Sequence, residues 1–77
     1  MEYNDEKVLL TELAKRVKQL RKERGLTQED CVNDTGISFS RIEMGSRDIS
    51  FTTLHKICIY FKISISDFFK DNFELSS

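Results

Sequence analysis

Apolar residues recur at intervals of three and four along most of the chain, a pattern that predicts amphipathic helices. The first apolar stripe comprises Leu10, Leu13, Ala14, Val17 and Leu20. Asn4 or Asp5 can cap the start of this helix, and Gly25 can end it in a left-handed turn. We therefore expect one long helix over the first third of the chain.

Hydroxyl residues mark the starts of two further helices. Thr27 is followed three residues later by Asp30, close to a capping box, and this helix should run to about residue 33 or 34. Ser50 can cap another helix. The buried stripe of that helix comprises Leu54, Ile57, Cys58 and Phe61.

Ser64 begins a last short helix, with Asp67 at its third position. This helix should run through Phe69 toward Phe73. The longest alternation of apolar and polar residues, at 63–66, coincides with this cap, so no sheet is expected. With a further helix near residues 35–44, the pattern predicts an all-α fold, a compact five-helix bundle.

Composition narrows the class of protein. The chain has 77 residues, which suits a single domain at 1–77 with a core of about 7–73. It has 39% hydrophobic and 32% charged residues and no proline, which is typical of a folded soluble chain. No apolar run approaches the roughly 18 to 20 residues that cross a bilayer, and the acidic start is unlike a signal peptide, so we expect a cytoplasmic protein without membrane contact. Cys31 and Cys58 fall on apolar positions, which favours buried reduced thiols.

Two motifs are more specific than any helix pattern. LRKERGLTQED spans Leu20 to Asp30, and RIEMG spans Arg41 to Gly45. Together they resemble the lambda-repressor and Cro-like helix-turn-helix family of bacterial and phage regulators, also called the xenobiotic-response-element type. The resemblance covers about residues 10–69. It implies a transcriptional regulator, of repressor or controller type, that reads a short inverted repeat in double-stranded DNA as a homodimer.

The resemblance also assigns roles to residues of the first two helices. The family forms a buried ion pair between the residues matching Arg21 and Glu43, and we treat this pair as structural because a lone buried charge is costly. A glutamine at the position of Gln28 clamps the DNA backbone in the family. Thr27 and Gln28 stand where backbone N–H groups and the helix dipole favour a phosphate. The alternative is a simple cap with an exposed glutamine.

One spacing departs from the family pattern. About ten residues usually separate the glycine of the turn from the glutamate, whereas Gly36 precedes Glu43 by seven. If the turn lost three residues, Asp34 or Thr35 caps a reading helix that spans about 35–44. If the turn is intact, Ser38 is the cap and the reading helix has lost a turn. We favour the first alternative, because we expect only this one to keep the register of Ile42 and Glu43, with Phe39 buried and Arg21 in reach of Glu43.

The favoured helix places a set of residues against the major groove, namely Gly36, Ile37, Ser38, Ser40 and Arg41. Arg41 is the strongest candidate for a base contact, since a guanidinium can bind guanine O6 and N7 together. The alternative for Arg41 is a phosphate contact or a plain surface charge. Ile37 can contact a thymine methyl group. Gly36 has no side chain to contact a base, and it can instead permit a close approach to the DNA backbone or to the preceding helix. Further phosphate contacts are expected from Arg47, Ser50 and Thr52.

Charge is unevenly distributed although its sum is small. The net charge is −1, but residues 7–24 contain seven basic residues against Glu12 and Glu23. This run indicates either a basic face on the first helix or a merely solvated one. The aromatic residues near the C-terminus also allow two interpretations, either as part of the hydrophobic core or as a dimer interface. They are Tyr60, Phe61, Phe68, Phe69 and Phe73.

Other functional classes find little support. His55 and Cys58 are the only pair with metal-ligand character, and two ligands do not make a four-coordinate zinc site. No phosphate-binding glycine loop or Ser-His-Asp set is present, so no enzyme, cofactor, metal or small-molecule ligand is expected. The rival interpretation is a protein-interaction or antitoxin-like module that has this fold and reads DNA weakly or not at all.

Overall fold

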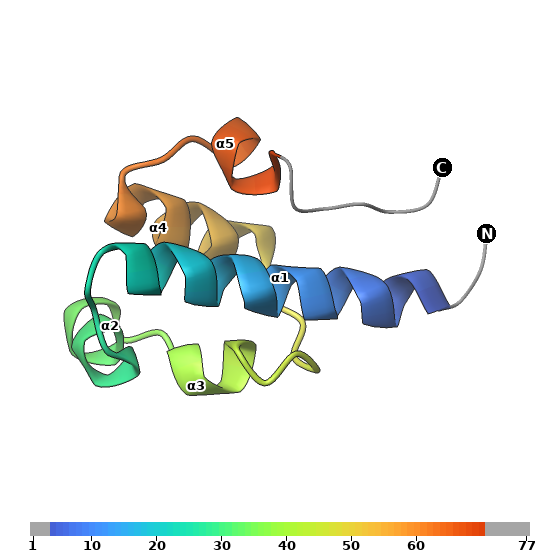
Figure 1. Cartoon of the computed structure of the whole chain (residues 1–77), viewed down its shortest axis with the longest axis horizontal. Helices are drawn as coiled ribbons and strands as arrows, with labels where there is room; N and C mark the ends of the chain where they lie inside the picture. Colours follow the sequence, from blue (N-terminus) through green and yellow to red (C-terminus); the bar gives the residue numbers. More distant parts are fainter. Residues whose placement is uncertain (1–3, 71–77) are drawn as a thin grey trace.

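The computed structural model describes residues 4–70, which form five helices (Figure 1). The helices are α1 (Asn4–Glu23), α2 (Gln28–Thr35), α3 (Phe39–Ile42), α4 (Phe51–Phe61) and α5 (Ile65–Phe69). α1 runs along the longest axis of the molecule, with α4 and α5 on one side and α2 and α3 on the other (Figure 1). No strand occurs within residues 4–70, so the expected all-α five-helix fold is confirmed. Phe73 lies outside the described residues.

The helix boundaries follow the capping residues closely. Gly25 adopts a positive φ of 67° after α1, and the Leu26 N–H donates to the Arg21 carbonyl across this turn (3.2 Å). Thr27 and Asp30 form the complete capping box of α2. The hydroxyl oxygens of Ser50 and Ser64 each accept a hydrogen bond from the backbone N–H three residues later. These local signals were therefore sufficient to place the starts of α2, α4 and α5.

The core lies between α1 and the four shorter helices. Each helix contributes at least one residue that is almost completely buried, including Val17, Cys31, Phe39, Ile57, Phe61 and Phe68. The Phe39 and Phe61 rings meet edge to face with centroids 5.9 Å apart, which joins α3 to α4. Cys31 and Cys58 are buried free thiols, and burial raises the pKa of both.

Two arginines, Arg16 of α1 and Arg24 directly after this helix, bind the carboxyl-terminal ends of other helices. The Arg16 Nε and Nη2 atoms donate to the carbonyls of Phe68 (2.7 Å) and Asp67 (2.6 Å) at the end of α5. The Arg24 Nε and Nη2 atoms donate to the Phe61 carbonyl at the end of α4 (3.1 and 2.7 Å). The last carbonyls of a helix have no partner within it, so these cations satisfy them and oppose the helix dipole.

We expect Arg24→Gln to lower the free energy of unfolding by about 1 to 2 kcal/mol, because charge-assisted bonds to the Phe61 carbonyl are lost. The loss also removes the contact of the guanidinium with the Phe61 ring, which lies 5.1 Å from the Arg24 Cζ atom. Urea denaturation followed by circular dichroism would measure the change. Lys56→Gln, an exposed α4 position with the same change of charge, is the matched control and should differ from the parent by less than about 0.5 kcal/mol. Equal effects of the two substitutions would contradict the capping role.

The expected reading helix over residues 35–44 is wrong. Gly36 takes the left-handed conformation (φ 76°) and ends α2, with its N–H donating to the Val32 carbonyl (2.7 Å). The Thr35 hydroxyl accepts a hydrogen bond from the Ile37 N–H (3.0 Å) and keeps the chain out of the helical path. Ser38 then stands at the N-cap of α3, without a side-chain capping bond, and only four residues follow in the helix. The alternative with an intact turn and a shortened helix is the correct one.

The shortened helix still buries Phe39 completely and still brings Glu43 to Arg21. The reason that favoured the longer helix was therefore wrong, because a four-residue turn is enough to set both positions. A Cβ atom at Gly36 would meet nothing within 4 Å. Its positive φ, rather than a close approach to a neighbouring helix, is what requires glycine there.

Candidate nucleic-acid interface

α3 is a single turn with a buried side and an exposed side. Phe39 and Ile42 point into the core, whereas Ser40, Arg41 and Met44 are exposed. Met44, just beyond the helix, is 76% exposed although its side chain is apolar. The Arg41 side chain forms no hydrogen bond or ion pair with any of residues 4–70. The outer side of α3 therefore presents an uncommitted guanidinium with five N–H donors.

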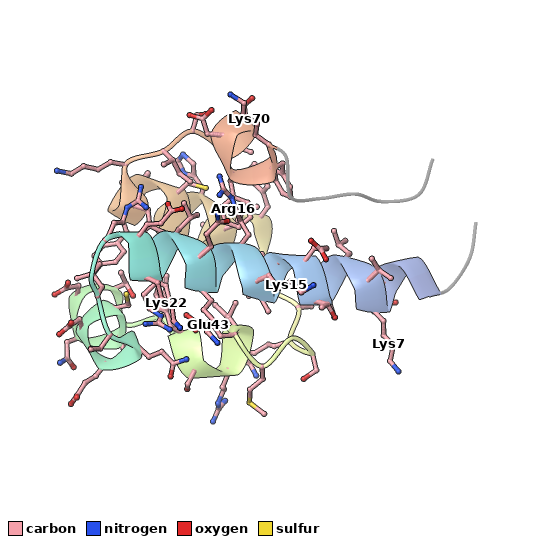
Figure 2. All side chains as sticks on the ribbon, viewed as in Figure 1. Lys7, Lys15, Arg16, Lys22, Glu43 and Lys70 are labelled. Carbon is pink, nitrogen blue, oxygen red and sulfur yellow. The ribbon has the colours of Figure 1, made fainter. Side chains whose placement is uncertain are left out.

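An ion pair fastens α3 to α1. Arg21 Nε donates to Glu43 Oε2 (2.8 Å) and Arg21 Nη2 donates to Glu43 Oε1 (2.9 Å), while the side chains are only 10% and 4% exposed. The remaining Arg21 nitrogen donates to the Leu26 carbonyl (2.8 Å). Hydrogen bonding to Glu43 raises the pKa of Arg21 further. Figure 2 shows Glu43 between α1 and α3, where this forked pair holds the end of α3.

Gln28 joins the same network from the start of α2. Its Nε2 atom donates to Glu43 Oε1 (2.9 Å), so three helices meet at one carboxylate. Sequence reasoning missed this bond and treated Gln28 either as a phosphate clamp or as an exposed residue of the cap. An amide nitrogen carries two hydrogens, so one remains for a phosphate.

The start of α2 is less favourable for a phosphate than its geometry suggests. The Thr27 hydroxyl accepts from the Asp30 N–H (3.0 Å), and the Asp30 carboxylate accepts from the Thr27 N–H (3.0 Å). These bonds lower the pKa of Asp30, which keeps its carboxylate charged. Glu29 adds a second negative charge in the first turn. Both charges oppose an incoming phosphate at Thr27 and Gln28.

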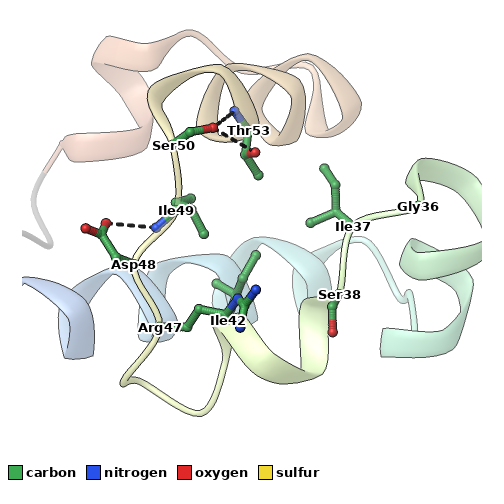
Figure 3. Close-up of a pocket in the computed structure, with 9 residues that line it drawn as sticks. All are labelled: Gly36, Ile37, Ser38, Ile42, Arg47, Asp48, Ile49, Ser50 and Thr53. Carbon is green, nitrogen blue, oxygen red and sulfur yellow. Dashed lines mark hydrogen bonds between the residues drawn. The ribbon is translucent and has the colours of Figure 1, made fainter.

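A hollow of about 310 Å³ separates the turn before α3 from the start of α4 (Figure 3). The side chains of Ile37, Ile42 and Ile49 border it, and polar residues surround them (Figure 3). Five of the expected site residues line this hollow, namely Gly36, Ile37, Ser38, Arg47 and Ser50. The structure thus brings these five together, whereas Thr27, Gln28, Ser40, Arg41 and Thr52 lie outside the hollow.

The residues around the hollow differ in whether their side chains form hydrogen bonds within the fold. The Ser50 hydroxyl accepts from the Thr53 N–H and donates to the Thr53 hydroxyl (both 3.0 Å). Asp48 Oδ1 accepts from the Ile49 N–H (2.8 Å). Arg47 is exposed and, among the described residues, has no hydrogen-bond or ion-pair partner. Of these side chains, Arg47 is the one with free donors.

The five arginines of the chain therefore divide into two groups. Arg16, Arg21 and Arg24 bind carbonyls or a carboxylate of the fold itself. Arg41 and Arg47, which make no such contact in the described structure, both lie on α3 or in the loop after it. Within the described residues, this division places the unsatisfied guanidinium donors on the helix that follows the turn and in the loop after it.

Among residues 4–70, no group of three or more His, Cys, Asp or Glu side chains is placed to hold a metal ion. His55 is exposed and Cys58 is buried, so the two do not converge. No described helix is long and apolar enough to cross a membrane.

Residues 14–72 match the sequence model of a helix-turn-helix domain family. The match includes all of α2, α3, α4 and α5 and the second half of α1. Comparisons with curated proteins and with solved structures return no significant match.

Proposed function

Because the chain belongs to the helix-turn-helix domain family, we propose that it is a DNA-binding transcriptional regulator of the lambda-repressor and Cro-like type. It acts in the cytoplasm without enzymatic activity or cofactor, and it binds double-stranded DNA. The observation that carries the proposal is the pair of uncommitted arginines, Arg41 and Arg47, at α3 and its following loop. Guanidinium donors left exposed at the helix after the turn suit phosphates and guanine edges.

In this proposal, α3 enters the major groove with Arg41 as the base-reading residue and Ser40 beside it. The turn that contains Gly36, Ile37 and Ser38 lies at the edge of the groove, because the one-turn helix α3 begins only after these residues. The remaining contacts are to phosphates. They come from Arg47, Ser50 and Thr52 on one side and from Thr27 and Gln28 on the other.

We propose that the regulator acts as a homodimer on an inverted repeat. Phe61 and Phe68 are core residues, and Tyr60 packs partly against that core, so these aromatics are not available as a seam. Phe69 is 40% exposed and lines an apolar groove of about 130 Å³ with residues of α1 and α4. Phe51, on the same groove, is 71% exposed. Exposed aromatics around an apolar groove suit a contact between two copies.

Selection from a random-sequence duplex library, followed by fluorescence-anisotropy titration at two salt concentrations, tests the regulator proposal. We expect enrichment of one short inverted repeat, and affinity for it that falls steeply as salt rises. Failure to enrich any sequence, with no binding to any duplex at low salt, would contradict the proposal.

A second candidate function is a protein-interaction module, which the acidic first turn of α2 favours. Glu29 and Asp30 stand where a DNA-binding domain would place its phosphate. Binding of such a module to its partner would depend weakly on salt compared with DNA binding. The titration described above separates the two functions.

A further inference from the structure

Four lysines lie on one face of α1 and define what we call the lysine stripe: Lys7, Lys15, Lys18 and Lys22. At about 100° and 1.5 Å per residue, they fall within a sector of about 80° and span about 22 Å along the helix. The apolar stripe of α1, which includes Leu13, Val17 and Leu20, lies on the opposite side and is buried. The lysine stripe is therefore the outer face of α1.

The lysine stripe is not neutralised by the fold. Lys7, Lys18 and Lys22 are exposed, and their side chains make no hydrogen bond or ion pair with any described residue. Lys15 lies 3.5 Å from Glu12 Oε2, but its side chain is 70% exposed, and such surface pairs contribute little. The arginines of the same helix, in contrast, all bind atoms of the fold. The basic run of α1 thus divides by residue type into inward arginines and outward lysines.

The stripe borders the segment that carries the uncommitted arginines. Gly45, just beyond α3, approaches α1 so closely that a Cβ atom there would lie 3.8 Å from Ala14 Cβ and 3.9 Å from Thr11 Cα. Thr11 is one helical turn from Lys7 and one from Lys15. Figure 2 shows Lys7 and Lys22 extending from α1 toward the side on which α2 and α3 lie. The lysine stripe therefore runs beside the segment that carries Arg41 and Arg47.

We infer that the lysine stripe binds phosphates of the DNA that flanks the bases read by α3. The inference rests on the proposed function and extends its binding surface from α3 to α1. An ammonium group is a flexible point charge, so it can follow a phosphate backbone without a fixed hydrogen-bond geometry. The amino-terminal half of α1 extends past α3 (Figure 1). Lys7 on this extension reaches phosphates that α3 and its loop do not.

The salt dependence of binding tests this surface. Each phosphate contact by a cation contributes about 0.9 to the slope of log K against log salt concentration on B-DNA. We expect the triple variant Lys7→Gln/Lys18→Gln/Lys22→Gln to reduce the magnitude of this slope by about 2.7 for each bound protomer, or by about 5.4 for a bound homodimer. Its affinity should fall by the same factor for the selected duplex and for a random duplex, because phosphate contacts carry no sequence information. Since the three side chains are exposed, its thermal unfolding should match that of the parent.

Two controls isolate the stripe. The triple variant Lys7→Arg/Lys18→Arg/Lys22→Arg keeps the charges and should keep the parent slope. Lys62→Gln removes one exposed lysine at the end of α4 and should leave the slope unchanged within about 0.3, a third of one contact.

Three outcomes would overturn the inference. One is that the triple glutamine variant shows the same slope of log K against log salt concentration as the parent protein, while the parent binds the selected duplex with strong salt dependence. Another is a decrease of the slope in Lys62→Gln that equals the decrease per lysine in the triple glutamine variant, which would assign the effect to the net charge of the protein. The third is an absence of DNA binding by the parent protein, which would remove the proposed function together with the stripe. The first two leave the proposed function standing, so the failures are distinguishable.

Discussion

Glu43→Ala should lower the free energy of unfolding by about 3 to 5 kcal/mol, because it leaves the buried Arg21 guanidinium without its carboxylate. The same change removes the acceptor of the Gln28 amide. α3 is a single turn without a side-chain cap, so little in the helix itself can compensate for the loss. A chain of this size has a total stability of roughly 4 to 12 kcal/mol, so the variant should be largely or partly unfolded. Thermal and urea unfolding followed by circular dichroism would measure the change.

A double variant separates the loss of an ion pair from the loss of packing. Arg21→Met/Glu43→Leu replaces both charges by apolar side chains of similar length, and we expect it to recover most of the stability lost in Glu43→Ala. Recovery would show that the cost comes from the unpaired charge. If Glu43→Ala instead lost less than about 1 kcal/mol, the pair would be no more important than an ordinary surface contact.

Arg41→Ala should abolish sequence preference while leaving the fold intact. A bidentate contact to guanine is worth roughly 1 to 3 kcal/mol, so the affinity for the selected duplex should fall about 5- to 150-fold for each half-site that a protomer reads. Affinity for a random duplex should change by much less. The Arg41 side chain is exposed and contacts no other described residue in a hydrogen bond or ion pair, so the unfolding temperature should not change. Competition anisotropy with selected and random duplexes would measure the ratio of affinities.

Arg41→Lys is the matched control for charge. A lysine can neutralise a phosphate but lacks the planar fork, so this variant should also lose preference while keeping most nonspecific affinity. Equal weakening of Arg41→Ala on both duplexes, with Arg41→Lys like the parent, would assign Arg41 to a phosphate and not to a base.

Local chemistry explains why four of the helices could be placed in advance. Thr27, Ser50 and Ser64 each bond a backbone N–H three residues later, and these contacts lie entirely within a few residues of chain. Gly25 likewise ends α1 by a conformation that glycine adopts at little cost. Such features depend on neighbours in sequence, so a residue pattern is enough to predict them.

The reading helix could not be placed in this way, because two local solutions competed. Thr35 and Ser38 are both residues that can cap a helix, and Gly36 can lie inside a helix at a cost or end one. The two solutions differ in free energy by the local contribution of about one helical turn. That contribution is small compared with the free energy of burying Phe39 and forming the Arg21–Glu43 ion pair. Those contacts depend on where α1 and α4 lie.

The sequence alone establishes an all-α chain with capped helices, an apolar stripe on α1 and the motifs of a helix-turn-helix domain, because these depend on residue type and spacing. Tertiary packing decides that α3 is one turn long, that Gln28 shares Glu43 with Arg21, and that three arginines serve the fold. It also decides that the side chains of Arg41, Arg47 and three lysines of the stripe, Lys7, Lys18 and Lys22, pair with no other described residue. The physical reason is that a charged side chain acquires its role from the groups within about 3 to 4 Å of it, and those groups come from distant parts of the chain.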